Sequence, residues 1–303
     1  MMTPKGVIYD RGYRRYEGAY RGRGYAIWSL LSADFGRALG IKKGLWYKVF
    51  LWLFFLIITV QTVFVFFVTL VTERVPQTPS AFSHPYSFLF DLMSTILWFL
   101  SAMVAPDLLT NDRKFKALQL YLVRPIELYD YLLAKAGALF GLLMVAALVP
   151  QLGLFAAKAF TAEDAVAYVA HHTRDLGALI LSSGLYALFY TVFAMAISSL
   201  TTRRGLATGA IIALPFFLGL GAALILVLTQ SQYFQLLDLD SLPAGLKSAL
   251  FGVSYGAQNV QITFGDRSFS LEPLDWSIYL LAYSAVIAFS LSVVLFSYAK
   301  ERS

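Results

Sequence analysis

Histidines and acids grouped in one stretch of the chain have side chains that would suit metal chemistry. His171 and His172 are adjacent, and Glu163, Asp164 and Asp175 lie nearby in the sequence. Imidazole and carboxylate groups bind Zn²⁺, but a stable site needs several ligands fixed in a tetrahedron. Adjacent histidines rarely bind one ion well without further fixed ligands, and these residues are typical of a solvated loop. We therefore expect no metal site here.

Nucleotide chemistry and covalent catalysis are also not expected of this chain. A P-loop has the pattern G-x-x-x-x-G-K-[ST], whose glycines and lysine cradle phosphate groups. The sequence contains no Gly-Lys pair, no Ser-Gly-Gly signature and no cysteine. We expect no catalytic residues and no cofactor on this chain. If it takes part in an ATP-driven process, ATP and Mg²⁺ belong to a partner.

The internal segment richest in charge is residues 110–135, "TNDRKFKALQLYLVRPIELYDYLLAK". Pro125 suits the first turn of a helix, because that position needs no backbone N–H. The apolar side of such a helix would carry Ile126, Tyr129, Leu132 and Leu133. A short amphipathic helix over 124–134, parallel to a membrane, would transmit a rigid-body push from a cytosolic protein to neighbouring helices.

The rest of the chain contains the membrane-spanning segments to which such a helix would be connected. The 303 residues are 58% hydrophobic and 14% charged, with a mean hydropathy of +0.66. A bilayer is crossed by about 20 apolar residues in a helix. Six runs meet this requirement and predict an all-α polytopic membrane protein, with spans at 49–72, 88–109, 136–157, 176–202, 205–229 and 277–299.

The positions of the basic residues predict the orientation of these spans. Most of the 24 lysines and arginines lie before the first span, in the 110–135 loop, at Arg203-Arg204 and at the C-terminus. Loops rich in Lys and Arg stay in the cytoplasm. Both termini are therefore expected to be cytoplasmic, as in an integral protein of a prokaryotic inner membrane.

Two segments precede the first span. Within residues 1–25, the stretch from Tyr9 to Tyr25 alternates Arg, Gly and Tyr, a mixture that can bind single-stranded nucleic acid. No folded recognition module accompanies it, so we expect a basic arm against anionic lipid and no nucleic-acid partner. Residues 26–48 predict an amphipathic interfacial helix. Its apolar side would include Leu30 and Ala38, and its polar side Asp34 and Arg37.

The loop between the fifth and sixth spans, residues 230–276, is long and mixed in character. "LPAGLKSALFGV" is too short and polar to cross a bilayer, but it would suit a re-entrant helix. "NVQITFGDRSFSLEP" predicts a hairpin that turns at Gly265-Asp266.

Ionisable residues are rare inside the spans. Asp91 and Asp107 lie near the ends of the second span and are expected to reach the interface. Spans three to six carry no ionisable residue in their interiors, which argues against a proton-coupled carrier. Gly137 and Gly141 in the third span are at small-xxx-small spacing and are expected to serve helix packing.

The order of these features resembles a known family, the integral membrane subunit of ABC-2 type ABC transporters (type V exporter-like). The resemblance is carried by a charged cluster after the second span, an apolar helix, Arg124-Pro125 and a Tyr-Leu-Leu-x-Lys motif that leads into the third span. The opening YDRGYRRYEG is also similar to this family. One departure is that DRKFKAL lacks the Gly-Thr that often follows the acidic residue of the charged cluster.

The resemblance implies a permease driven by a separate ABC ATPase subunit, with a second permease copy as a homodimer or a paralogous heterodimer. The expected ATPase-coupling residues are Asp112, Arg113, Lys114, Arg124, Pro125, Glu127, Tyr129 and Asp130. In that family the second and fifth spans line the substrate path, which points to Trp98, Met103, Phe216 and Phe217. The uncharged lining suggests export of a hydrophobic or amphipathic cargo. The alternative is a scaffold or sensor subunit that transmits the ATP-driven change to a partner protein and moves no solute.

Overall fold

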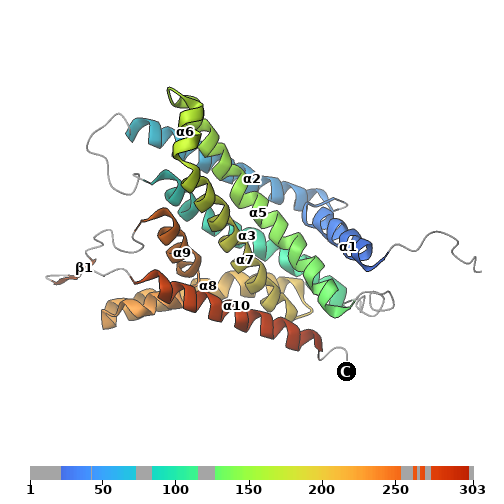
Figure 1. The fold of residues 1–303 in the computed structure, drawn as a ribbon. Helices are drawn as coiled ribbons and strands as arrows, with labels where there is room; N and C mark the ends of the chain where they lie inside the picture. The colour runs from blue at the N-terminus through green and yellow to red at the C-terminus, as the bar shows by residue number, and fades with distance from the viewer. Residues whose placement is uncertain are drawn as a thin grey trace, which may run out of the picture.

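The protein is a bundle of long helices with six elements able to cross a membrane (Figure 1). The computed structural model describes residues 22–41, 43–72, 84–114, 127–253, 262–264, 267–269 and 274–299. The candidate spans within them are α2 (Leu45–Thr72), α3 (Pro85–Lys114), α5 (Leu128–Thr161), α7 (Thr173–Ser199), α8 (Arg204–Thr229) and α10 (Trp276–Ala299). The prediction of six apolar spans is confirmed. Several helices extend beyond their apolar runs, because backbone hydrogen bonding does not stop where hydropathy falls.

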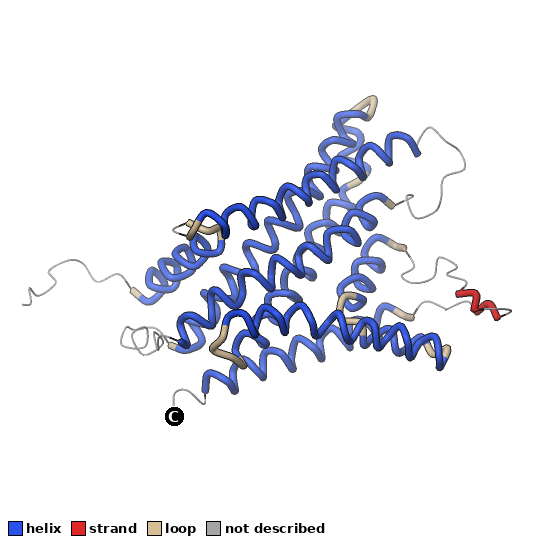
Figure 2. Tube along the Cα trace, turned by 180° about the vertical axis from the view of Figure 1, so that it is seen from behind, coloured by secondary structure: helices blue, strands red, loops and turns tan. Residues whose placement is uncertain are grey.

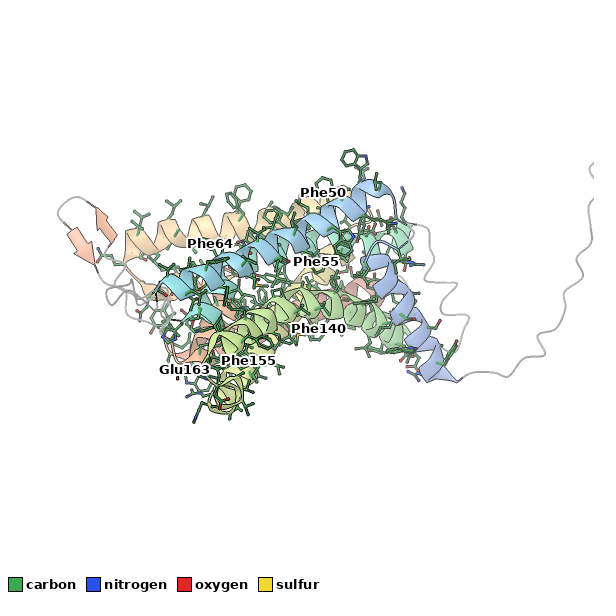
Figure 3. All side chains as sticks on the ribbon, turned by 90° about the horizontal axis from the view of Figure 1, so that it is seen from above. Phe50, Phe55, Phe64, Phe140, Phe155 and Glu163 are labelled. Atoms are coloured by element: carbon green, nitrogen blue, oxygen red, sulfur yellow. The ribbon has the colours of Figure 1, made fainter. Side chains whose placement is uncertain are left out.

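Three helices form the centre of the bundle and three lie around it. In α3, α5 and α7, 61, 50 and 67% of the apolar stretch is buried, against 17, 22 and 22% in α2, α8 and α10. At the centre, the rings of Phe90 on α3 and Tyr186 on α7 stack with centroids 5.5 Å apart. On α2, by contrast, Phe50 and Phe64 are more than half exposed (Figure 3). The outer helices therefore present apolar faces that suit lipid or another chain.

The first helix, α1 (Arg23–Ala38), packs across the beginning of α5 (Figures 1 and 2). A Cβ at Gly137 would lie 3.0 Å from Leu31, and one at Gly141 would lie 3.4 Å from Phe35. The packing role predicted for the two glycines is thus confirmed, and α1 is the helix that they admit. The expected single helix over 26–48 ends earlier, because Gly40 adopts a left-handed φ of 77° and a new helix, α2, begins at Leu45.

One end of the bundle collects the start of α1, the end of α3, the start of α5 and the end of α10 (Figure 1). The rings of Tyr131 on α5 and Tyr298 on α10 are 6.1 Å apart there, and Arg113 of α3 lies over the Tyr298 ring. We call this the α1 end. The opposite end, where α6 (Ala165–His171) joins α5 to α7, is the α6 end.

The segment after α8 turns back into the bundle. Gln230 takes a left-handed conformation, and the short 3-10 helix η2 (Gln232–Leu237) follows. A Cβ at Gly219 would lie 3.4 Å from Oδ1 of Asp238. Gly219 is ten residues before the end of α8, which corresponds to about 15 Å of helix. The chain therefore runs back along α8 by that distance.

The next helix, α9 (Ser241–Phe251), is buried from Ser241 to Ser248 and does not cross the bundle. It lies among α3, α7 and α10 (Figure 2). Gly245 lets it approach α10, since a Cβ there would lie 2.5 Å from the Tyr279 ring. Beyond it, β1 (Ile262–Phe264) and β2 (Arg267–Phe269) pair antiparallel on either side of the predicted turn at 265–266.

Candidate functional site

The predicted coupling residues lie at the end of α3, at the start of α5 and in the segment between these two helices. Asp112, Arg113 and Lys114 form the last turn of α3. Arg124 and Pro125 lie outside the described residues. Glu127 is the N-cap of α5, and its side chain and that of Asp130 form a capping box. This start explains one difference from the sequence prediction: residues 128–134 are the first turns of the long helix α5 and form no separate helix.

An arginine of α1 binds the start of α5. The Arg23 guanidinium donates to both carboxylate oxygens of Asp130, through Nε at 2.8 Å and Nη2 at 2.9 Å. Its Nη1 also donates to Glu127, at 3.0 Å. The hydrogen bond to Asp130 is the main reason why the pKa of Arg23 is raised. Tyr129, between the two acids in sequence, is 61% exposed and points to the surroundings.

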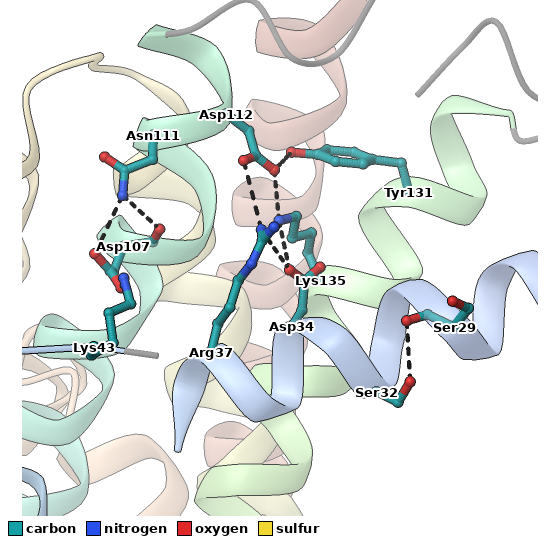
Figure 4. Close-up of polar contacts among 10 residues, drawn as sticks. All are labelled: Ser29, Ser32, Asp34, Arg37, Lys43, Asp107, Asn111, Asp112, Tyr131 and Lys135. Atoms are coloured by element: carbon teal, nitrogen blue, oxygen red, sulfur yellow. Dashed lines mark hydrogen bonds and ion pairs between the residues drawn. The ribbon is translucent and has the colours of Figure 1, made fainter. Parts of the chain in front are cut away.

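About one helical turn further along α5, a buried set of charges joins α1, α3 and α5 (Figure 4). Nζ of Lys135 lies 3.1 Å from Oδ1 of Asp34 and 2.6 Å from Oδ2 of Asp112. The Lys135 and Asp34 side chains are both fully buried. Tyr131 donates to Asp112 at 3.0 Å, and Arg37 donates to Asp34 at 3.2 Å. We call these five residues the Lys135 cluster.

The position of Asp34 corrects the sequence prediction. The sequence pattern predicts Asp34 on the polar side of an interfacial helix, yet its carboxylate is buried against α5. Burial raises the pKa of Asp34, and the charge of Lys135 opposes this rise. The polar stripe of α1 therefore faces protein, because Lys135 supplies a matching charge.

A second ion pair set lies beside α8. Asp107 of α3 binds Lys43, which precedes α2, and Arg204 at the start of α8, whose Nη1 is 3.0 Å from Oδ1. The Asp107 side chain is 2% exposed between these two basic residues, and its expected position at the membrane interface stays a prediction. It connects α3 to the outer helices α2 and α8.

The four predicted substrate-path residues do not form one surface within this chain. Trp98 is partly buried and donates from Nε1 to the carbonyl of Ile211 on α8, at 2.8 Å. Met103 packs against the core. Phe216 and Phe217 are 56 and 67% exposed on α8. Of these four residues, Trp98 is the one with a hydrogen bond between the second and fifth spans.

Sequence reasoning missed a polar cluster around α9 and the residues just before it. Lys247 of α9 binds Asp91 of α3, and its Nζ also donates to the carbonyl of Ser87, at 3.1 Å. Asp240, just before α9, accepts from Ser94 of α3 at 3.0 Å and from Tyr190 of α7. A lysine in the otherwise apolar 241–251 stretch was the available signal. Asp240 and Lys247 lie outside the six spans, so the sequence argument against a proton-coupled carrier, which considered spans three to six alone, did not take these two groups into account.

The histidines take no part in these clusters. His172 stacks on Tyr168 with centroids 4.1 Å apart, and its Nδ1 lies 2.8 Å from the Tyr168 carbonyl. His84 and His171 are exposed. Among the described residues, no three His, Asp or Glu side chains gather where they could hold a metal ion.

Comparisons with known proteins add no relative to this picture. No protein-family model matches the chain, and no curated protein sequence matches it. The family resemblance therefore depends only on the motifs quoted above and on the order in which they occur.

Proposed function

We propose that the chain is the membrane-spanning permease subunit of an ABC-type exporter and that a separate ATPase subunit drives it. The α1 end would face the cytoplasm, and residues 115–126 with their flanking turns would receive the push of the ATPase. The cargo would be hydrophobic or amphipathic and would leave at the α6 end.

One observation carries this proposal: both ends of the 115–126 segment are tied to the same cross-lying helix, α1. The α3 end is tied through Asp112, Lys135 and Asp34. The α5 end is tied through Asp130 and Arg23. A force on this segment would therefore move α1, α3 and α5 together, which is what transmission from a cytosolic motor requires.

The exposed apolar helices support assembly with a second copy. An exporter path between two permeases needs chains that leave one face uncovered, and α2 and α8 are the least buried spans together with α10. Phe216 and Phe217, which are exposed on α8, would then line the path between this chain and the partner copy. The same proposal puts α1 at the membrane interface and the basic arm of residues 1–25 against anionic lipid.

The test is reconstitution with an ATPase. The chain would be co-expressed with a Walker-motif ATPase encoded beside its gene, and the complex placed in vesicles with a fluorescent phospholipid analogue as the cargo probe. We expect ATP-dependent movement of the probe. Lys114→Glu, an exposed change at the end of α3, should leave insertion intact and uncouple ATP hydrolysis from movement.

A matched control is Arg174→Glu, an exposed charge reversal on α7 at the α6 end, which should behave as wild type. The proposal fails if no ATPase co-purifies, or if the purified chain moves the probe alone. ATP hydrolysis that responds to a partner protein, with no probe moved, would favour the scaffold or sensor alternative.

A further inference from the structure

We propose that the outward face of α2, in the half of that helix next to the α1 end, binds one phospholipid with an anionic headgroup. The lipid phosphate would bind Lys48, and one acyl chain would lie along the groove that runs from Leu45 to Thr59. This inference concerns a lipid site on one helix and does not depend on whether the chain belongs to an exporter.

An apolar groove with a volume of about 680 Å³ follows this face of α2. The described residues that line it all belong to α2, and they recur at the three- and four-residue spacing of one helix face. Among them, Leu45, Trp52 and Leu56 are 75, 70 and 58% exposed. The rings of Trp52 and Phe55 have centroids 6.2 Å apart and form part of the wall (Figure 3). The groove therefore opens away from the bundle, toward lipid.

The length of the groove matches one leaflet of a bilayer. Lys48 and Thr59 are eleven residues apart on α2, which is about 16 Å of helix. Half of a hydrocarbon core of about 30 Å is about 15 Å. Thr59 keeps its end of the groove compatible with lipid, because its hydroxyl donates to the helix carbonyl of Phe55 at 2.8 Å. An acyl chain that starts beside Lys48 would therefore contact α2 along the depth of its own leaflet.

The charge at the start of the groove favours an anionic headgroup. Lys48 is exposed, and no ion pair joins its side chain to another residue in the described part of the chain. Near it, Lys43 and Arg204 share the single acid Asp107, and Arg203 is exposed. Four basic residues thus accompany one acid at this corner of the bundle. A lipid phosphate would compensate part of this excess of positive charge.

The turn before α2 positions Lys48. A Cβ at Gly40 would lie 3.4 Å from Cγ of Lys48 and 2.9 Å from the Tyr47 ring, so both side chains lie close to the backbone at Gly40. The Tyr47 hydroxyl donates to the Ala38 carbonyl at 3.0 Å, which connects the start of α2 to the end of α1. The stem of Lys48 is therefore held before a lipid arrives. Trp52, one turn further along, suits the boundary between headgroups and acyl chains.

A second copy of the chain fits this face less well than a lipid does. In a two-fold contact the same patch of each copy meets itself. Two copies in one membrane would then bring their Lys48 ammonium groups to the same depth, and no acid is among the described residues that line the groove. Like charges placed opposite one another repel. The groove is therefore covered by lipid, and contact with a second copy would use the other outer helices, α8 and α10.

The experiment is quenching of Trp52 fluorescence by brominated phospholipids in reconstituted bilayers of the full chain. Trp28, Trp46 and Trp276 are changed to Phe, Trp98 is kept, and the emission of the same chain with Trp52→Phe is subtracted. Brominated phosphatidylglycerol should bind beside Trp52 about fivefold more strongly than brominated phosphatidylcholine, which is the contribution expected of one lysine near an anionic headgroup. Salt at about 1 M should remove most of this preference.

The variants separate the charge from the apolar groove. Lys48→Met should bring the two lipids to equal binding, and Lys48→Arg should keep the preference. Arg174→Met, which removes an exposed cation at the α6 end, is the matched control and should behave as wild type. In bilayers or bicelles of zwitterionic lipid alone, Lys48→Met should insert and fold like wild type, because no anionic headgroup is there to bind.

Equal binding of the two lipids to the wild-type reporter overturns the site, and so does a preference that survives in Lys48→Met. If Lys48→Met does not insert, a preference in the wild-type reporter that salt leaves unchanged overturns it. The chain contains no cysteine, so Leu56→Cys reports on a second copy directly. A disulfide-linked dimer of this variant in the membrane would show that α2 packs on α2, and would also overturn the proposal.

Discussion

Replacing Lys135 by methionine should be the most damaging single change at the α1 end. Methionine keeps the length and apolar stem of the side chain but removes its charge. The Lys135 side chain is fully buried, and its two carboxylate partners, Asp34 and Asp112, are 0 and 12% exposed. A second cation, Arg37, is half exposed and lies 3.2 Å from Asp34 and 4.0 Å from Asp112. The variant would therefore leave two acids with little compensation.

The expected loss is about 3–5 kcal/mol of unfolding free energy, because breaking a buried ion pair leaves an unpaired buried charge. Protonation of Asp34 can relieve part of this loss, since burial already raises its pKa. The loss should therefore be larger at pH 8 than at pH 5. Unfolding of the chain in bicelles, followed by tryptophan fluorescence, measures both values.

A double variant tests whether the loss comes from the stranded charge. Asp34→Asn in the Lys135→Met background should recover about 1–3 kcal/mol, because the two side chains are directly coupled. Lys48→Met, which removes an exposed lysine from the start of α2, is the matched control and should change stability by less than about 0.5 kcal/mol. Equal stabilities for Lys135→Met and Lys48→Met, or strict additivity in the double variant, would refute the reasoning.

Three further changes test other contacts. The stability that Asp34 contributes is present below its ordinary pKa and lost as pH rises through its raised one, so Asp34→Asn should flatten the pH dependence of unfolding above about pH 4. Gly245→Ala should cost about 1–3 kcal/mol in bicelle unfolding, because its methyl group would meet the Tyr279 ring; Gly209→Ala, into open space, should not destabilise the chain. Arg23→Ala should speed hydrogen exchange in α1 while leaving α9 unchanged, and unchanged α1 exchange would contradict the tether.

The spans could be predicted from sequence because lipid imposes a local rule. Each stretch must satisfy its own backbone and be apolar over the bilayer, so hydropathy alone finds it. The bounds were less predictable. At α5, Lys135 ended the predicted apolar run, but the helix begins seven residues earlier, at Leu128, where Glu127 and Asp130 cap it. Hydropathy reports where a helix is apolar, and capping reports where it starts.

The Lys135 cluster could not be predicted in the same way. Asp34 and Lys135 are 101 residues apart in sequence. The pattern of α1 shows one polar and one apolar stripe, but periodicity does not say whether the polar stripe meets water or a charge on another helix. The predicted coupling residues Asp112 and Asp130 do lie in this part of the chain. Their contacts with α1 needed the three-dimensional structure.

The short helix α9 shows why such polar contacts matter for the fold itself. With 11 residues, α9 is too short to span a bilayer, so the membrane cannot fix its depth as it fixes that of α8 or α10. Close packing of Gly245 on Tyr279 sets its distance from α10. Its position relative to α3 and α7 is set by Lys247 and Asp240, at opposite ends of the buried stretch. An apolar residue in place of Lys247 or Asp240 would leave α9 buried but would remove the directional bonds to α3 and α7. The charged residues of this segment, and not its hydropathy, therefore determine the position of α9.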